Sequence, residues 1–428
     1  MTEQEITALG PAFAAYLRRF RDSFGQDRTA AHFGTYCRGL LSDLPRKSVE
    51  PIALGAGTAV RTLQEFLVTA RWDHGRTRDT LQRHLAGAIA DLPADPLGTV
   101  GVVDETSCRK WGDQTPGVQR QYLGCVGKID SGIVTVHLGV ARGTFQALLD
   151  ADLYLPKGWA ADRERCRDAG IPDDVKYRPK WRLAVDQWLR LTGGGVSFDW
   201  LVFDEGYGSK APLLRFLNLV GQPFVAEVPV NFTVRDGAGP PARRADDRLT
   251  AADARAGRRH RPARRTVRAS FWRAATAAVW VADREHTLVA AVNEATAEVK
   301  YFLTNATTAP VARVLAVAFR RAVVEHAFRL GKQEAGLMHY EGRDYTGLRR
   351  HLILALVVLG FVATHTERLR GEKPVGDGRA GVPGAEPTVR GGAPAAAGRR
   401  RGPAHQRGHP VPPEAERPGR QIPQEAAA

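Results

Sequence analysis

Hydrophobic positions over residues 1–95 recur at the spacing of amphipathic helices. The clearest stretches are AAYLRRFRDSF, AVRTLQEFLVTARW and TRDTLQRHLAGAIADL, and turn signals separate them. The pattern predicts a small helical domain at the start of the chain.

From Thr99 the pattern changes to β-branched, apolar runs of strand length. TVGVVDE, QRQYLGCVGKI and GIVTVHLGVAR are interrupted by two turn signals, and the last two runs predict a hairpin. A helix around KWRLAVDQWLRL, a strand FDWLVFD, a helix KAPLLRFLNLV and a strand PFVAEVP follow. The predicted order, β-β-β-α-β-α-β, is typical of an α/β sheet with helical crossovers.

After Pro229 this alternation breaks, and Gly, Pro and Arg dominate RDGAGPPARRADDR and ARAGRRHRPARRTVR. Both segments predict basic loops. Short strand-like runs up to Ala309 indicate a β-rich insertion rather than a continuation of the parallel sheet. A long helix over about residues 311–336 is expected to close the fold. The apolar run 352–364 is shorter than the roughly 20 residues of a membrane-spanning helix, so we expect a buried core helix there.

The end of the chain has a different composition. From residue 371 it holds ten Pro and eleven Gly in 58 residues, with no Leu and no aromatic residue. Such a segment buries too little apolar surface to offset its conformational entropy, so we expect disorder.

The whole chain is strongly basic. Its 428 residues carry 61 Lys and Arg against 46 Asp and Glu, which gives a formal charge of +15. An excess of this size argues against an ordinary neutral metabolic enzyme and favours a polyanionic partner, with nucleic acid first, because cations that neutralise phosphates release condensed counterions.

The cysteines and the N-terminus indicate in which cellular compartment the protein is expected to work. Cys37, Cys108, Cys125 and Cys166 form no C-x-x-C pair, so neither a zinc site nor a disulfide framework is indicated. The start MTEQEITALG lacks the basic and apolar regions of a secretory signal. A reducing cytoplasm fits best.

Acidic residues close two of the predicted strands. Asp104 ends GVVD, and Asp204 ends WLVFD immediately before a Gly-Tyr-Gly turn. In an RNase H-like strand order the first and fourth strands are neighbours, which would bring the two carboxylates together. Close carboxylates repel unless they are protonated or bridged by cations, so a Mg²⁺ site is one interpretation. The alternative is that each is an ordinary strand-end or helix-capping Asp.

A third carboxylate can come from the long helix near the end of the fold. Arg321, Glu325 and Lys332 fall within roughly 40° of one another around the helix, whereas Glu334 lies far from them. A carboxylate between cations suits a metal ligand beside bound phosphates. The alternative, which the helix alone favours, is an exposed ion-pair face contributing about 0.3–0.5 kcal/mol.

Four segments resemble successive blocks of bacterial insertion-sequence transposases of the DDE class. They are VDETSCRKWGDQTPGVQRQYLGCVGKID, DADLYLPKGWAADRERCRDAGIP, LVFDEGYG and VVEHAFRLGKQEAGLMHYEGRDYTGLRRHL, and the resemblance covers most of residues 30–365. The helix signature R-x3-E-x6-K of that family is present as Arg321, Glu325 and Lys332. Ala318 stands where a tyrosine often precedes the signature.

The resemblance implies a set of site residues. Asp104, Asp204 and Glu325 would be the catalytic triad and would hold two Mg²⁺ ions, with Mn²⁺ as a substitute. Arg321 and Lys332 would contact phosphates of the element's terminal nucleotides.

It also implies a function. A transposase would cleave double-stranded DNA at the element's ends and transfer the freed 3′ end into target DNA, as a homodimer in the bacterial cytoplasm, associated with the nucleoid. Two alternatives are a DNA-binding remnant that has lost catalysis and an RNase H-like structure-specific nuclease that cuts without joining.

The expected fold class is α/β, with an RNase H-like catalytic core and a β-rich insertion. The expected parts are a helical DNA-binding or dimerisation domain (1–95), the first part of the core (96–230), the insertion (231–309), the C-terminal helices of the core (310–370) and a disordered tail (371–428).

Further DNA contacts are expected in the insertion. Trp272 or Trp280 would hold a flipped base, since stacking contributes about 1–3 kcal/mol, although a strand-core tryptophan is the more ordinary interpretation. Arg243, Arg244 and the run ARAGRRHRPARR are candidate phosphate contacts, or a solvated loop.

The tail also suggests a shifted reading frame, because codons for its last 25 residues can be chosen so that the next frame encodes a Lys/Arg-rich helix. Nine cations against six anions give this tail +3, which leaves +12 of the total charge for DNA.

Overall fold

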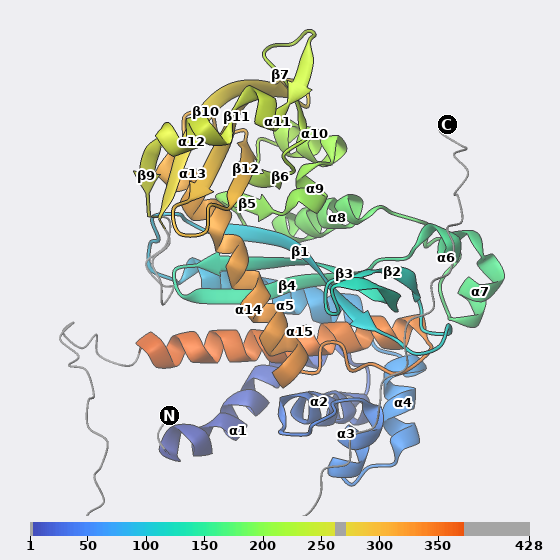
Figure 1. The fold of residues 1–428 in the computed structure, drawn as a ribbon. Helices are drawn as coiled ribbons and strands as arrows, with labels where there is room; N and C mark the ends of the chain where they lie inside the picture. Colours follow the sequence, from blue (N-terminus) through green and yellow to red (C-terminus); the bar gives the residue numbers. More distant parts are fainter. Residues whose placement is uncertain (1–2, 262–270, 372–428) are drawn as a thin grey trace, which may run out of the picture. The chain divides into compact units, whose positions relative to one another are not determined.

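The computed structural model describes residues 3–261 and 271–371 (Figure 1). The predictions for the tail beyond residue 371, including the shifted reading frame, lie outside the described residues. So does the end of the second basic loop.

The predicted helical character of residues 1–95 is confirmed. The elements are α1 (Glu3–Leu17), η1 (Arg18–Ser23), α2 (Asp27–Leu41), α3 (Val49–Gly55), α4 (Val60–Val68) and α5 (His74–Ala90). Their aromatic side chains, among them Phe20, Tyr36 and Phe66, are fully buried. These residues belong to the same hydrophobic core as the sheet, so the boundary near residue 95 stays a prediction.

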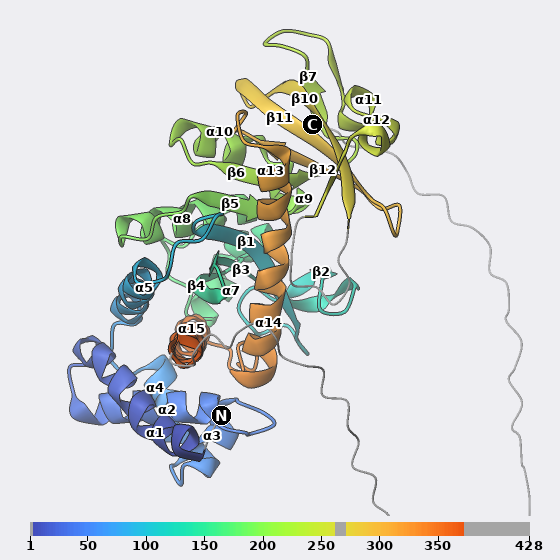
Figure 2. The same ribbon diagram turned by 90° about the vertical axis from the view of Figure 1, so that its left-hand side faces the viewer.

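The helix α15 (Tyr345–Gly371) is longer than the predicted apolar run and lies between the N-terminal helices and the sheet (Figures 1 and 2). It contacts α2, α4, α5 and strand β4 (Phe145–Leu153). Arg350 ties it to the end of α4, because its guanidinium donates to the carbonyls of Leu67 (2.9 Å), Ala70 (2.9 Å) and Trp72 (3.0 Å).

By length and composition α15 is the one helix among the described residues that could cross a membrane. Half of its most apolar window is buried inside the protein, as the predicted core helix would be.

The first part of the sheet contains the predicted strands and one that was not expected. Its strands are β1 (Val100–Arg109), β2 (Gln119–Leu123), β3 (Lys128–Arg142), β4, β5 (Trp200–Phe203) and β6 (Phe224–Val228). The β2–β3 hairpin is confirmed, and β1 runs parallel to β5, as expected for the first and fourth predicted strands. Because β4 is a fourth strand before the first crossover helix, the predicted count of three was wrong.

Two buried aspartates explain why β4 was missed. Asp150 and Asp152 interrupt its apolar pattern, yet Asp150 is only 1 % exposed. Both pair with Arg190, whose Nε lies 2.9 Å from Asp150 Oδ2. A buried carboxylate that is paired in this way is tolerated in a strand, and no local pattern indicates the partner.

Helices cross between these strands. They are α6 (Lys157–Ala161), α7 (Arg163–Asp168), α8 (Lys180–Gly193), α9 (Glu205–Gly208) and α10 (Ala211–Leu219). Helix α8, which carries Arg190, covers β3 and β4.

The predicted insertion is β-rich, but it extends the same sheet. It contains β7 (Thr233–Arg235), β8 (Ala242–Arg244), α11 (Ala245–Arg248), α12 (Ala251–Ala256), β9 (Arg258–His260), β10 (Trp272–Val281), β11 (Arg284–Asn293) and β12 (Val299–Thr304). These strands pair antiparallel to one another, and β12 pairs antiparallel to β6. The parallel sheet therefore ends at β6, while the hydrogen-bonded sheet continues.

The long helix predicted over residues 311–336 is interrupted. It consists of α13 (Val311–Ala318), a 3-10 turn η2 (Phe319–Arg321) and α14 (Ala322–Glu334). No proline or glycine marks the interruption. The ring of Phe319 packs against Trp272 at 4.9 Å and Phe302 at 6.0 Å between centroids, so contacts with the insertion accompany the turn.

Candidate active site

Two neighbouring parallel strands bring Asp104 and Asp204 to one edge. Their register pairs Val102 with Val202, so each aspartate lies two positions farther along the chain. Asp204 directly follows β5, as predicted, but β1 continues past Asp104 to Arg109, so the predicted strand end at Asp104 was wrong. Asp104 is 7 % exposed. Asp204 also caps α9, because its Oδ1 accepts a hydrogen bond from the backbone N–H of Tyr207 (3.3 Å). For Asp204 the capping interpretation therefore holds alongside the proximity to Asp104.

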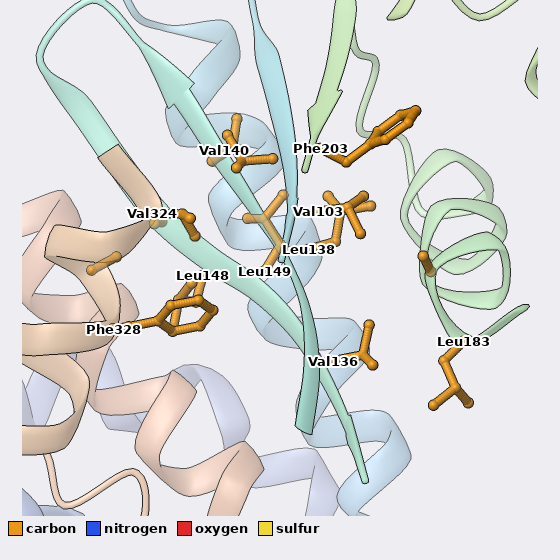
Figure 3. Packing of buried hydrophobic residues seen from close by; sticks show 14 of the residues in the cluster. Val103, Val136, Leu138, Val140, Leu148, Leu149, Leu183, Phe203, Val324 and Phe328 are labelled. Atoms are coloured by element: carbon orange, nitrogen blue, oxygen red, sulfur yellow. The ribbon is translucent and has the colours of Figure 1, made fainter. Parts of the chain in front are cut away.

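Glu325 reaches the same place from α14. Its neighbours Val324 and Phe328 are buried and lie beside Leu148 of β4, which holds the helix against the sheet (Figure 3). The Glu325 side chain is 61 % exposed. Three segments far apart in sequence thus supply one carboxylate each.

These carboxylates line one cavity of about 480 Å³. Lys332 lines it too, whereas Glu334 does not, in agreement with the predicted helical spacing. The remaining lining residues are Glu105, Thr106, Ser107, Tyr122, Gly124, Cys125, Phe328, Arg329 and Gln333.

Arg321 connects two of the carboxylates. Its Nη1 lies 3.0 Å from Asp104 Oδ2, and its Nη2 lies 3.6 Å from Glu325 Oε1. Burial of the guanidinium opposes its charge, but Asp104 and Asp204 outweigh burial and raise the pKa of Arg321. Arg321, which we expected to contact phosphate, is therefore a counter-ion of the carboxylates in this structure. The predicted ion pair on the helix face is also present, between Arg321 and Glu325.

Burial is the main electrostatic feature of Asp104. It raises the pKa of this carboxyl to about 6, although the charge of Arg321 acts in the opposite direction. The negative charge of Asp204 raises this pKa further, and the backbone N–H of Glu105, 2.7 Å from Oδ1, lowers it. A buried carboxyl beside a second one is stabilised in its charged form by a cation.

The donor set fits a divalent cation of the Mg²⁺ class, which prefers carboxylate oxygens. The carboxylates are not gathered closely, however. Within residues 3–261 and 271–371, no group of three or more His, Cys, Asp or Glu side chains could hold a metal ion together. Because Arg321 pairs with both Asp104 and Glu325, a shared cation would require its guanidinium to leave them.

The structure does not place the tryptophans of the insertion at this cavity. Trp272 is 3 % exposed in the core, beside Phe319. A stacked base needs an open ring face, which Trp272 does not offer in this conformation. Its burial favours the strand-core interpretation, and the DNA contact stays a prediction. Trp280 is half-buried and lines a separate cavity together with Arg215 and Arg235.

Arg243 and Arg244 are exposed on β8 and do not line the cavity of Asp104, Asp204 and Glu325. Arg243 pairs with Asp236 at 2.9 Å, and Arg244 pairs with Asp246 at 2.7 Å. Phosphate binding by either residue would compete with these exposed ion pairs, which are individually weak.

Tyr122 is a residue of the cavity that the sequence did not single out. It is 63 % exposed on β2, at a position where the strand alternates between half-buried and exposed side chains. An aromatic residue on the polar face of a predicted hairpin is the signal that could have identified it.

Comparison with known proteins places the chain in a family. Residues 19–288 match the model described as "DDE superfamily endonuclease", a range that includes Asp104 and Asp204 but ends before Glu325. The chain is also 34% identical over 198 residues to a protein of Microchaete diplosiphon named "Probable transposase for insertion sequence element IS701". That match covers 46% of this chain and 47% of the relative, so it spans about half the length of each.

The family match covers more than half of the 428 residues and contains β1, in which Asp104 lies, and β5, which Asp204 follows. The chain belongs to the DDE superfamily endonucleases.

Proposed function

We propose that the protein is the transposase of an insertion sequence, which cleaves DNA at the element's ends and transfers the freed 3′ end into target DNA. The observation that carries the proposal is the single cavity lined by Asp104, Asp204 and Glu325, with Lys332 on its wall. The name of the Microchaete relative supports it. The adjacent parallel strands β1 and β5 support an RNase H-like core.

DDE transposases are generally dependent on a divalent metal, and we assign Asp104, Asp204 and Glu325 as the ligands. We propose two Mg²⁺ ions, for which Mn²⁺ substitutes. When bound, such ions activate water for attack on a phosphodiester and stabilise the departing 3′ oxygen.

Arg321 changes partners in this proposal. In the structure its guanidinium neutralises Asp104 and Glu325. A guanidinium matches phosphate geometry as well as carboxylate geometry, so phosphate of the bound DNA would take it over. Lys332, whose pKa burial lowers, supplies a second cation on the same wall.

The partner in this proposal is double-stranded DNA, both the inverted repeats of the element and the target. The +12 charge outside the tail supports it. We assign α1–α5 to DNA binding or dimer contacts in a synaptic homodimer that works in the cytoplasm at nucleoid DNA.

A cleavage assay tests the catalytic assignment. The substrate is a duplex carrying the inverted repeat read from DNA that flanks the gene, incubated with Mg²⁺ or Mn²⁺. We expect Asp104→Asn and Glu325→Gln to abolish cleavage while duplex binding stays within about twofold, because each removes a carboxylate that holds the metal.

Exposed carboxylates nearby provide matched controls. Glu205 follows Asp204, and Glu334 ends the helix of Glu325, yet neither lines the cavity. Glu205→Gln and Glu334→Gln should cleave like the wild type. Full cleavage by Asp104→Asn or Glu325→Gln would refute the triad. A wild-type chain that binds ends without cutting, or cuts without joining, would support a remnant or a nuclease instead.

A further inference from the structure

A second cavity, of about 620 Å³, is lined by residues that directly follow those of the first cavity in the sequence. Residues 104–107 line the catalytic cavity, and residues 108–111 line the second. A second segment repeats this order, with lining residues between 325 and 333 in the first cavity and between 338 and 341 in the second. The two cavities therefore follow one another along the same pair of segments.

Each of these cavities is lined by one exposed aromatic ring. Among the large apolar side chains exposed in the described residues, the aromatic ones are Trp111 (81% exposed) and Tyr122 (63%). Trp111 lines the second cavity and Tyr122 the catalytic one. The guanidinium of Arg109 lies 4.2 Å from the centroid of the Trp111 ring. Since most of the ring is open to solvent, it can accept a further planar group.

The second cavity is also rich in cations. Arg46, Arg109 and Lys110 line it, against the single carboxylate of Glu341, which pairs with Arg46. Arg109 pairs with Asp130 at 3.0 Å from outside the cavity. An open aromatic ring among cations is the combination that binds unpaired nucleotides, because bases stack on the ring while phosphates contact the cations.

The positive charges near this cavity also affect a histidine on its wall. His339 lines the second cavity, and burial lowers its pKa. The positive charges of Arg46, Lys47 and Lys110 lower this pKa further. His339 therefore has positive side chains as its charged neighbours on this wall.

We propose that the second cavity binds an unpaired nucleotide of the DNA strand that enters the catalytic cavity, with its base stacked on Trp111 and its phosphates on Arg46, Arg109 and Lys110. This inference rests on the proposed function, since it takes DNA as the substrate. The five steps along the strand from Asp104 to Arg109 span about 17 Å, so the nucleotide lies a few positions from the reacting phosphodiester. The ring reaches a base only where that base has left the duplex stack.

Binding of single-stranded DNA by the full chain tests this site. The probes are a short fluorescent oligo(dT) and a blunt duplex of equal length, measured by anisotropy in EDTA. Trp111→Ala should weaken oligo(dT) binding by roughly 5- to 150-fold, the range expected for one lost stacking contact, and leave duplex binding within about twofold. Trp111→Phe, which keeps a ring, should restore most of the oligo(dT) affinity.

Leu219 provides the control, because it is 85% exposed and lines neither cavity. Leu219→Ala should bind both probes like the wild type. As a direct check on stacking, a 2-aminopurine base in the oligonucleotide should be quenched by the wild type and not by Trp111→Ala.

Two results would overturn the proposal: unchanged oligo(dT) affinity in Trp111→Ala, or an equal loss for both probes. Its failure differs from failure of the proposed function. A chain that cleaves transposon ends but loses no oligo(dT) affinity in Trp111→Ala refutes only the nucleotide site. A chain that binds oligo(dT) through Trp111 but never cleaves the ends refutes only the transposase.

Discussion

At the scale of single residues, Arg321 determines the charge balance of the site. It is 25 % exposed and pairs with carboxylates from β1 and from its own helix. Without it, Asp104 and Asp204 would face each other across neighbouring strands with little compensation. In the proposed function the same side chain pairs with a phosphate of the DNA, so neutralising these carboxylates and binding DNA are alternative uses of one guanidinium.

Arg321→Ala should therefore lower the cleavage rate by more than any loss of folded protein accounts for. Loss of a charged hydrogen bond to phosphate costs about 1.5–3 kcal/mol, which corresponds to a decrease of roughly 10- to 150-fold in cleavage rate. The salt dependence of end binding should also lose about one phosphate contact. Rates and affinities are measured on the same duplex at several salt concentrations.

Arg313 is the matched control, since it is exposed on the preceding helix α13 and does not line the catalytic cavity. Arg313→Ala should cleave like the wild type. An Arg321→Ala variant with normal cleavage and normal salt dependence would contradict the exchange of partners and leave Arg321 with a structural role only.

At the scale of elements, the spacing of apolar residues predicted the helices and strands that the local sequence determines. The N-terminal helices, the β2–β3 hairpin and the aspartate that follows β5 all follow from apolar patterns and turn residues. Features fixed by distant contacts could not be predicted this way. Strand β4 depends on Arg190 of α8 to neutralise its aspartates, and the interruption at Phe319 depends on Trp272.

The turn after Asp204 is an element whose packing can be tested. A Cβ on Gly208 would lie 2.1 Å from the backbone oxygen of Glu227 in β6, which cannot move aside like a side chain. Gly208→Ala should shift α9, destabilise the protein by about 1–3 kcal/mol and disturb the cap that Asp204 makes. Urea unfolding measures the first effect and end cleavage the second.

Gly158→Ala on α6 is the comparison, because nothing lies within 4 Å of a Cβ at that position. It should be neutral or stabilising by up to about 1 kcal/mol, since alanine is the better helix former. Equal stabilities of the two alanine variants would show that α9 is not held against β6 as closely as the structure indicates.

At the scale of the whole molecule, the buried histidines contribute no positive charge to the folded protein. The net positive charge is the feature that the proposed function relates to DNA. His137, His286 and His351 are fully buried, and burial lowers their pKa values, to about 3 for His137 and to about 4 for the other two. These histidines are neutral in the folded core, while in the unfolded chain they take up protons near their ordinary pKa of about 6.5.

Stability should therefore fall on acidification. A histidine whose folded pKa is depressed stabilises the fold above its unfolded pKa, and this contribution is lost as the pH falls from about 6.5 toward 4, because only the unfolded chain binds the proton. At about pH 4.5 each of the three should lower the free energy of unfolding by roughly 2–3 kcal/mol relative to pH 7. Asp104 has the opposite effect, because its pKa is raised to about 6 in the folded protein, which then binds a proton more readily than the unfolded chain. Its protonation offsets about 2 kcal/mol of the loss in stability.

The expected net loss of roughly 4–7 kcal/mol is comparable with the whole stability of a typical protein, about 5–15 kcal/mol, so acid unfolding should occur above pH 4. Urea unfolding at the two pH values measures it. His286→Gln should shrink the difference between them by about 2–3 kcal/mol, whatever it costs at pH 7, because glutamine does not titrate. Equal free energies of unfolding at both pH values in the wild type would show that these histidines can be protonated in place, and hence that water reaches the core around them.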